Sequence, residues 1–210
     1  MIFYMSAIRR FGRQLWREPH TVMHASLLMT LLGLPVVTMG FALCTGALYM
    51  HHKEAGEQIG FRSALKMVRP VAGKAIAMGL ADLAGAVACI SCIAWLIAGK
   101  GFAQTLPSVI LLYLLLFCLS TALYRYPALA LNQQLTLPQL MLCATGMVLK
   151  NMGYVFLYWC VMLLALMACA ATGVGLVLLL PGCVALMMAA AWSETLKREE
   201  YTKNKGGIPV

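Results

Sequence analysis

The chain has 210 residues, of which 62% are hydrophobic and only 11% are charged, and its formal net charge is +9. A soluble globular domain is about half apolar and about a quarter charged, so the composition excludes an ordinary soluble fold. The basic residues lie in short segments beside apolar runs, which is typical of membrane-protein loops and not of a nucleic-acid-binding surface. We therefore predict an all-α, polytopic transmembrane helix bundle with no nucleic-acid partner.

Residues 1–18 form a basic amphipathic segment. Its four arginines occupy one helical face, and apolar side chains recur along the other. Such a helix lies in the headgroup region of an anionic leaflet, so we predict an N-terminal interfacial helix over 1–18, with the anionic cytoplasmic leaflet of the bilayer as its partner. An ordinary basic flank of the first span is the alternative.

The same basic segment and the apolar run after it have the outline of a signal peptide. Cleavage requires small residues at the processing positions. In the best candidate site, Phe41 and Leu43 occupy those positions. We therefore expect the segment to be a retained anchor.

Residues 21–52 predict a short helical hairpin. The first apolar run, 21–34, is followed by Pro35, and proline kinks or ends a helix because it lacks the backbone donor and clashes with the preceding turn. Thr38 is a suitable N-cap for a second helix over 37–52. Each arm is short for the roughly 30 Å hydrocarbon layer, which takes about 20 residues of helix.

Four further apolar runs predict four further spans, separated by two short turns and by two semi-polar connectors. The six predicted spans cover about 21–34, 37–52, 75–98, 106–124, 152–171 and 176–193. Together with the interfacial helix they make a single membrane domain, 1–198, which is followed by a charged tail, 199–210.

The positions of the positive charges predict the orientation. With six spans, fifteen of the sixteen Lys and Arg residues lie on one side of the membrane, and Lys100 alone lies on the other. If residues 21–50 cross only once, the resulting five-span alternative divides the same charges eleven to five at best. Because cytoplasmic loops carry the excess of Lys and Arg, six spans with both termini in the cytoplasm are favoured.

The sequence contains no pattern that indicates a reaction. Its eight cysteines all lie in apolar stretches, where they are typical of small packing residues. A Gly-rich phosphate loop, a Ser/His/Asp set and paired carboxylates are all missing from it. We predict no enzymatic activity, no metal site and no cofactor.

Asp82 is the acidic residue that lies well inside a predicted span. An unpaired carboxylate in hydrocarbon costs at least about 2.5 kcal/mol, so Asp82 is expected to face protein or water. Either it holds a neighbouring helix through a polar contact, with His24 of the first span as the candidate partner, or it binds a proton or a cation. The third hypothesis is that Asp82 lies in a water-filled vestibule.

Two rows of small residues have the four-residue spacing of close helix crossings. They are Ala77, Ala81 and Gly85 in the third span, and Thr38, Ala42 and Gly46 in the second. We predict that both rows pack against neighbouring helices.

Tyr124, Arg125 and Tyr126 end the fourth predicted span. Aromatic residues and arginine at the cytoplasmic end of a span usually anchor it at the membrane surface. We therefore predict an anchor there, with a docking ledge for a partner as the alternative.

Three segments resemble the YesL-like family, a group of bacterial integral membrane proteins defined as a domain of unknown function. They are Leu34-Pro35-Val36-Val37-Thr38-Met39-Gly40, Ala47-Leu48-Tyr49 and Phe61 through Lys66. The resemblance covers roughly residues 20–80 in detail and the rest by hydropathy. The chain departs from the family at Arg69-Pro70, near where members often carry asparagine. The resemblance implies a multi-pass protein of the bacterial cytoplasmic membrane, with a link to carbohydrate uptake and no catalytic residues.

Two classes of function remain open. The first is a non-enzymatic accessory or scaffold component of a solute-uptake system, with a membrane permease as partner. The family resemblance, the few intramembrane polar groups and the basic connectors favour it. The alternative is a small transporter or channel-like carrier that uses Asp82 as an intramembrane proton or cation site. A repeated order of span, connector and returning span favours the alternative, because such repeats are common in transporters.

Overall fold

The computed structural model describes residues 12–13, 16, 18–33, 36–57, 59–98, 102–172 and 180–204. The predicted interfacial helix over 1–18, the break at Pro35 and the end of the predicted tail therefore lie largely outside the described residues. Every regular element in the described ranges is helical, which confirms the all-α prediction for this part of the chain.

The helices follow the predicted apolar runs closely. In chain order they are α2 (Pro19–Gly33), α3 (Met39–Glu54), α4 (Phe61–Val68), α5 (Ala72–Ala98), α6 (Phe102–Leu131), α7 (Leu137–Lys150), α8 (Met152–Thr172) and α10 (Leu180–Asn204). Single 3-10 turns, η1 (Val36–Thr38) and η2 (Arg69–Val71), precede α3 and α5. The two semi-polar connectors contain α4 and α7.

The predicted boundaries differ most at the end of α10, which runs to Asn204 instead of about 193, and next at the end of α6. Helix α6 passes through Pro127 and continues to Leu131 instead of ending near residue 124. Proline removes one backbone hydrogen bond. Here the turn is held by burial, because Tyr126, Pro127 and Leu129 are fully buried against the rest of the core.

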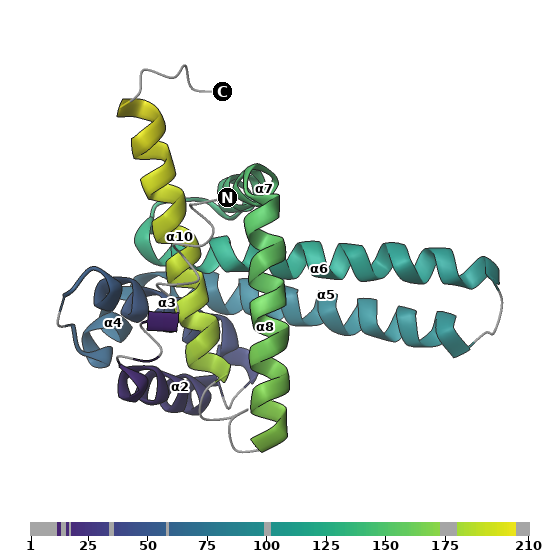
Figure 1. Ribbon diagram of the computed structural model, residues 1–210, viewed down its shortest axis with the longest axis horizontal. Coiled ribbons are helices and arrows are strands. Elements are labelled where there is room, and N and C mark those ends of the chain that lie inside the picture. Colours follow the sequence, from purple (N-terminus) through teal and green to yellow (C-terminus); the bar gives the residue numbers. More distant parts are fainter. Residues whose placement is uncertain are drawn as a thin grey trace.

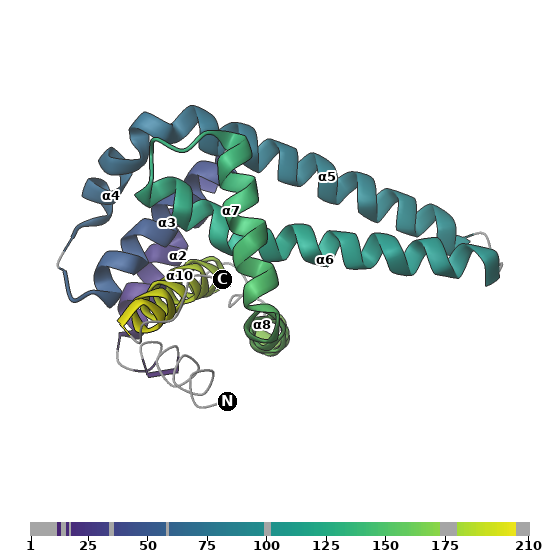
Figure 2. The same ribbon diagram turned by 90° about the horizontal axis from the view of Figure 1, so that it is seen from above.

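The helices do not lie parallel to one another. Figure 1 shows α5 and α6 as a long antiparallel hairpin that projects from a body containing α2, α3, α4 and α10. Helix α8 runs across this hairpin in Figure 1 and is seen end-on in Figure 2. The chain therefore turns sharply between α7 and α8, by 88°.

Asn151 explains the sharp turn. Its side-chain amide donates to the carbonyl oxygen of Met147 (3.0 Å) and completes the last turn of α7. Its own carbonyl oxygen accepts from the backbone N–H groups of Tyr154 (2.9 Å) and Val155 (3.0 Å), which begin α8. One residue thus satisfies backbone groups at two helix ends, which otherwise lack partners.

The apolar helices are suited to a membrane. Within the described residues, Phe61–Ala98 and Thr105–Leu131 are each long and apolar enough to cross a bilayer. Helices α7 and α8 supply a third crossing if the bent pair counts as one broken span, and Leu180–Leu196 is a shorter apolar helix. The described residues therefore contain two to three candidate spans, and the six-span topology stays a prediction.

Helices α3 and α5 cross at Gly40 and Gly79. A Cβ atom added to Gly79 would lie 2.7 Å from the Cα atom of Gly40, and one added to Gly40 would meet the carbonyl oxygen of Ala75. Contacts this short are with backbone atoms, which cannot move aside easily. The crossing therefore requires glycine on both helices and brings α5 directly onto the centre of the molecule.

The predicted row on α5 is placed differently. Ala77, Ala81 and Gly85 are exposed, and nothing in the described chain lies within 4 Å of a Cβ atom built on Gly85. This corrects the prediction of packing through these residues. Helix α5 turns its face with Ala75 and Gly79 inward, because that face meets Gly40 of α3.

The predicted row on α3 lies at a helix contact. Ala42 and Gly46 are buried, and a Cβ atom on Gly46 would overlap the side chain of Met29 from α2. Thr38, in η1, donates its hydroxyl hydrogen to the carbonyl oxygen of Leu32. The small residues thus allow α2 and α3 to lie against each other on either side of the predicted break.

Candidate functional site

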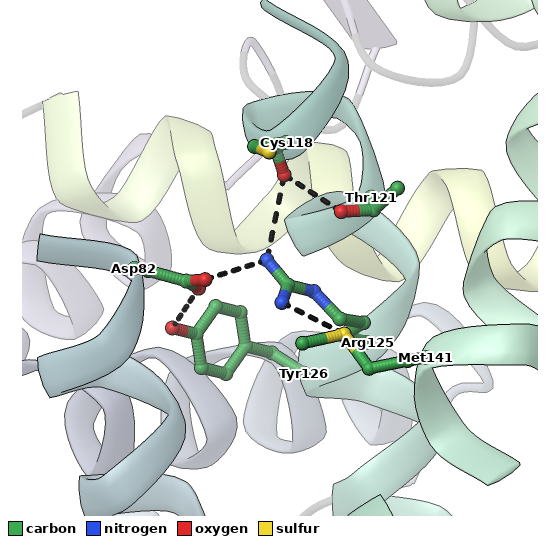
Figure 3. Close-up of polar contacts among 6 residues, drawn as sticks. All are labelled: Asp82, Cys118, Thr121, Arg125, Tyr126 and Met141. Carbon is green, nitrogen blue, oxygen red and sulfur yellow. Dashed lines mark hydrogen bonds and ion pairs between the residues drawn. The ribbon is translucent and has the colours of Figure 1, made fainter. Parts of the chain in front are cut away.

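The most developed polar cluster joins α5 to α6 through Asp82. Arg125 donates from Nη2 to Asp82 Oδ1 at 2.8 Å, and the hydroxyl of Tyr126 donates to Asp82 Oδ2 at 2.8 Å. Figure 3 shows both α6 side chains converging on the carboxylate. Each carboxylate oxygen therefore has its own donor, and the charge of Asp82 is balanced by a guanidinium.

Arg125 makes further contacts with α7 and with its own helix, α6. Its Nη1 atom lies 3.1 Å from the sulfur of Met141 in α7, and Nη2 also reaches the carbonyl oxygen of Cys118 at 3.4 Å (Figure 3). The Arg125 side chain is 3% exposed, whereas that of Asp82 is 25% exposed. The pair is therefore buried on the arginine side and partly open on the carboxylate side.

Tyr126 connects this cluster to the centre of the molecule. The sulfur of Cys44 in α3 lies 3.6 Å from the backbone oxygen of Tyr126. Because α3 also meets α5 at Gly40 and Gly79, three helices converge beside the Asp82 carboxylate. A buried polar cluster of this kind fixes the relative position of helices, even though Nε of Arg125 has no hydrogen-bond partner in the described part of the chain.

Among the three hypotheses for Asp82, this geometry favours a contact between helices. A cation at the carboxylate would have to displace Arg125 or remain beside its positive charge. A carboxylate that accepts from both a guanidinium and a phenol is therefore poorly placed to bind a cation reversibly. The observed contacts are those of a buried ion pair that joins two helices.

The predicted partner of Asp82 was wrong. His24 is exposed on α2, and the donors to Asp82 come from α6. Helix α2 packs against α3 and α10 instead, where Ser26 accepts from the backbone N–H of Gly182 at 2.8 Å. Since α5 meets a different helix, a histidine on α2 cannot serve as its partner.

The interpretation of Tyr124, Arg125 and Tyr126 as a surface anchor also needs correction. All three side chains are buried, with relative exposures of 0%, 2% and 1%. Because α6 continues to Leu131, these residues lie inside the helix rather than at its end, and they face α3, α5 and α10. They are therefore not available as a docking ledge.

A second buried polar group was missed by the sequence reading. The hydroxyls of Tyr154 and Tyr158 in α8 lie 2.9 Å apart, with their rings edge to face. Tyr124 and the carboxylate of Glu54 lie close enough to interact electrostatically with both hydroxyls, and the carboxylate of Glu194 interacts with that of Tyr154. Glu194 is only 4% exposed. Four helices, α3, α6, α8 and α10, thus contribute to this tyrosine–glutamate cluster.

The sequence indicates the tyrosine–glutamate cluster only weakly. Tyr154 and Tyr158 are four residues apart on one helical face, which is a pattern for a shared contact. Glu194, however, begins the charged end of the chain, so it reads as solvated. It is buried because α10 continues as a helix to Asn204 and carries this turn past α6 and α8.

Trp159 joins α8 to α6 beside these tyrosines. Its indole Nε1–H donates to the hydroxyl oxygen of Ser120 at 2.8 Å, and Ser120 donates to the carbonyl oxygen of Leu116 at 2.7 Å. A buried indole N–H usually finds such a partner. This bond is the main polar link between α8 and the hairpin among the described residues.

A metal site is not formed in the part of the chain that the structure describes. There, no three His, Cys, Asp or Glu side chains are grouped so that they could hold an ion. An apolar pocket of about 250 Å³ lies between α2, α3 and the start of α10, lined by Met29, Thr30, Gly33, Met39, Ala42, Leu43 and Pro181. Its lining offers few polar groups to orient a ligand.

No family model, curated protein or solved structure matches the chain. The resemblance to the YesL-like family therefore stays a prediction. The interpretation of the site rests on its geometry alone.

Proposed function

We propose that this protein is a non-enzymatic accessory or scaffold component of a solute-uptake system in the bacterial cytoplasmic membrane. Two features support the proposal. The intramembrane carboxylate is engaged in holding helices together, and long apolar helices present side chains that the chain itself leaves uncovered. The family resemblance adds carbohydrate as the proposed class of solute.

The uncovered apolar surface carries the proposal. Large apolar side chains are exposed along the α5–α6 hairpin and along α8, among them Trp95, Leu106, Tyr113, Phe156 and Leu164. A soluble monomer rarely exposes contiguous apolar surface on this scale. Lipid covers such a surface in a membrane, and a helix of a partner protein covers it equally well. Two separate projecting elements therefore suit a protein that both spans a membrane and binds a neighbour.

Purification from native membranes tests the proposal. We expect a permease subunit to remain bound in stoichiometric amount in a mild detergent, and we expect liposomes that contain only this protein to show no solute flux. Replacing Phe156 and Leu164 by alanine should reduce the amount of bound permease, because both side chains are exposed on α8. Replacing Met23 and Leu27 on α2, which are also exposed, is the matched control.

The alternative function, a small transporter or carrier, makes the opposite prediction. In that case liposomes with this protein alone show flux, and Asp82→Asn abolishes it. The tyrosine–glutamate cluster is the observation that favours this alternative, because buried carboxylates in membrane proteins often line ion pathways. Flux that survives Asp82→Asn but is lost in Glu194→Gln would move the proposed ion site to that cluster.

The six-span topology is tested by labelling single cysteines in a variant without the native ones. In the six-span arrangement, Val37→Cys lies outside the cell and should react with a membrane-impermeant thiol reagent in intact cells. Val37 is exposed, so its side chain can react. Ser63→Cys, on the first connector, should react only after permeabilisation. Equal behaviour of the two positions would contradict the predicted hairpin.

A further inference from the structure

An exposed row of three cations lies on α4 and the turn that follows it. Arg62, Lys66 and Arg69 are spaced four and three residues apart, which places them on one helical face. All three are exposed, whereas Ala64 and Val68 on the opposite face are buried. The helix is therefore amphipathic, with its apolar face fixed to the protein and its basic face turned outward.

No acidic residue lies close to this basic row in the sequence. Between Glu57 and Asp82 the sequence contains no aspartate or glutamate. In the described part of the chain, Arg62, Lys66 and Arg69 make no ion pair. Three cations within two helical turns repel one another. An anion that binds across them reduces this repulsion and therefore stabilises the arrangement.

The next cation along the chain has a different role. Lys74, at the start of α5, donates to the backbone oxygens of Gln133 (3.4 Å) and Leu135 (3.1 Å). Gln133 in turn donates to the backbone oxygen of Met67 at 2.8 Å. These bonds attach the connector between α6 and α7 to the backbone of α4 and to the start of α5. They hold the basic row in place and leave its outer face open.

The position of α4 indicates what anion it meets. Helix α4 and η2 lead without a loop into α5, and Phe61–Ala98 together make one candidate membrane span. Figures 1 and 2 place α4 at the end of α5 that is far from the tip of the hairpin. A helix at that end of a span lies at the depth of the lipid headgroups. The exposed side chain of Met67 beside Lys66 provides an apolar contact of the kind that enters the acyl boundary.

We propose that Arg62, Lys66 and Arg69 form a binding site for the phosphate headgroups of anionic phospholipids. The site would hold the α4 end of the α5–α6 hairpin at the membrane surface. In the predicted orientation this is the cytoplasmic leaflet. The site is separate from the interfacial helix predicted over 1–18, and it does not depend on the proposed role in uptake.

Lipid titration of the detergent-solubilised protein, followed by native mass spectrometry, tests the site. We expect phosphatidylglycerol to bind more tightly than phosphatidylcholine with the same acyl chains. The double variant R62Q/K66Q should weaken phosphatidylglycerol binding by on the order of tenfold or more, because each cation near an anionic surface contributes separately. It should leave phosphatidylcholine binding unchanged. Added salt should reduce the preference, since exposed charges are screened.

The control variant K53Q/K150Q removes the same net charge from α3 and α7 and should retain the preference. The charge-conserving variant R62K/K66R should retain it as well. Equal losses in R62Q/K66Q and K53Q/K150Q would overturn the proposal, because net charge alone would then explain the binding. Inorganic phosphate that displaces the lipid at similar concentration would overturn the assignment to a lipid headgroup. The unfolding temperature of each variant separates lost binding from lost folding.

Discussion

Replacing Arg125 by methionine is expected to lower the free energy of unfolding in detergent by about 3 kcal/mol. The substitution keeps most of the side-chain volume but leaves the Asp82 carboxylate with Tyr126 as its remaining donor. Losing one partner of a buried ion pair costs about 3–5 kcal/mol. The lower end applies here, because the Asp82 side chain is 25% exposed and water can reach it.

Replacing the other partner, Asp82, by asparagine should lower the free energy of unfolding by at least as much. It leaves the guanidinium of Arg125 unbalanced, and that side chain is only 3% exposed. The double variant Asp82→Asn/Arg125→Met should therefore lose less stability than the two single changes added together. Urea or thermal unfolding in one detergent measures the cycle, and Arg62→Met on the exposed face of α4 is the control. Strict additivity of the two changes would show that the contact contributes no coupling.

Hydropathy was sufficient to find the helices that coincide with long apolar runs, but it did not predict α4 and α7, which lie in the semi-polar connectors. The gap between α2 and α3 and the whole of α5 follow from this pattern. The end of α6 does not follow from this pattern. In the sequence, Arg125 with Pro127 two residues later resembles the end of a helix at a membrane surface. Only the contacts of Tyr126 and Leu129 with the core show that burial extends the helix.

The sequence alone could not identify which side chains contact one another in the candidate site. The pattern of a single helix predicts that Asp82 lies inside a span, but it does not identify the helix that contacts Asp82. Arg125 was counted as a loop charge because arginine in a membrane protein usually lies at the surface. Its pairing with Asp82 removes it from that count. The charge argument for six spans therefore depends on the remaining fourteen cations that the six-span prediction places in the cytoplasm.

Gly79→Ala is expected to destabilise the protein by about 3 kcal/mol, at the upper end of the cost of overpacking a core. The new Cβ atom would lie 2.7 Å from both the Cα atom and the backbone nitrogen of Gly40. Both are backbone atoms of α3, so relief requires the helices to separate.

Gly85→Ala on the same helix should instead stabilise the protein. No atom of the described chain lies within 4 Å of its Cβ position, so alanine gains only its helix preference, worth up to about 1 kcal/mol over glycine. Unfolding temperatures of both variants in one detergent make the comparison, and the identical chemical change removes any effect of residue type. If Gly85→Ala destabilised the protein as much as Gly79→Ala, the exposed row Ala77, Ala81 and Gly85 would have to be covered in the assembled protein. A second copy or a partner helix would then contact α5 at that row.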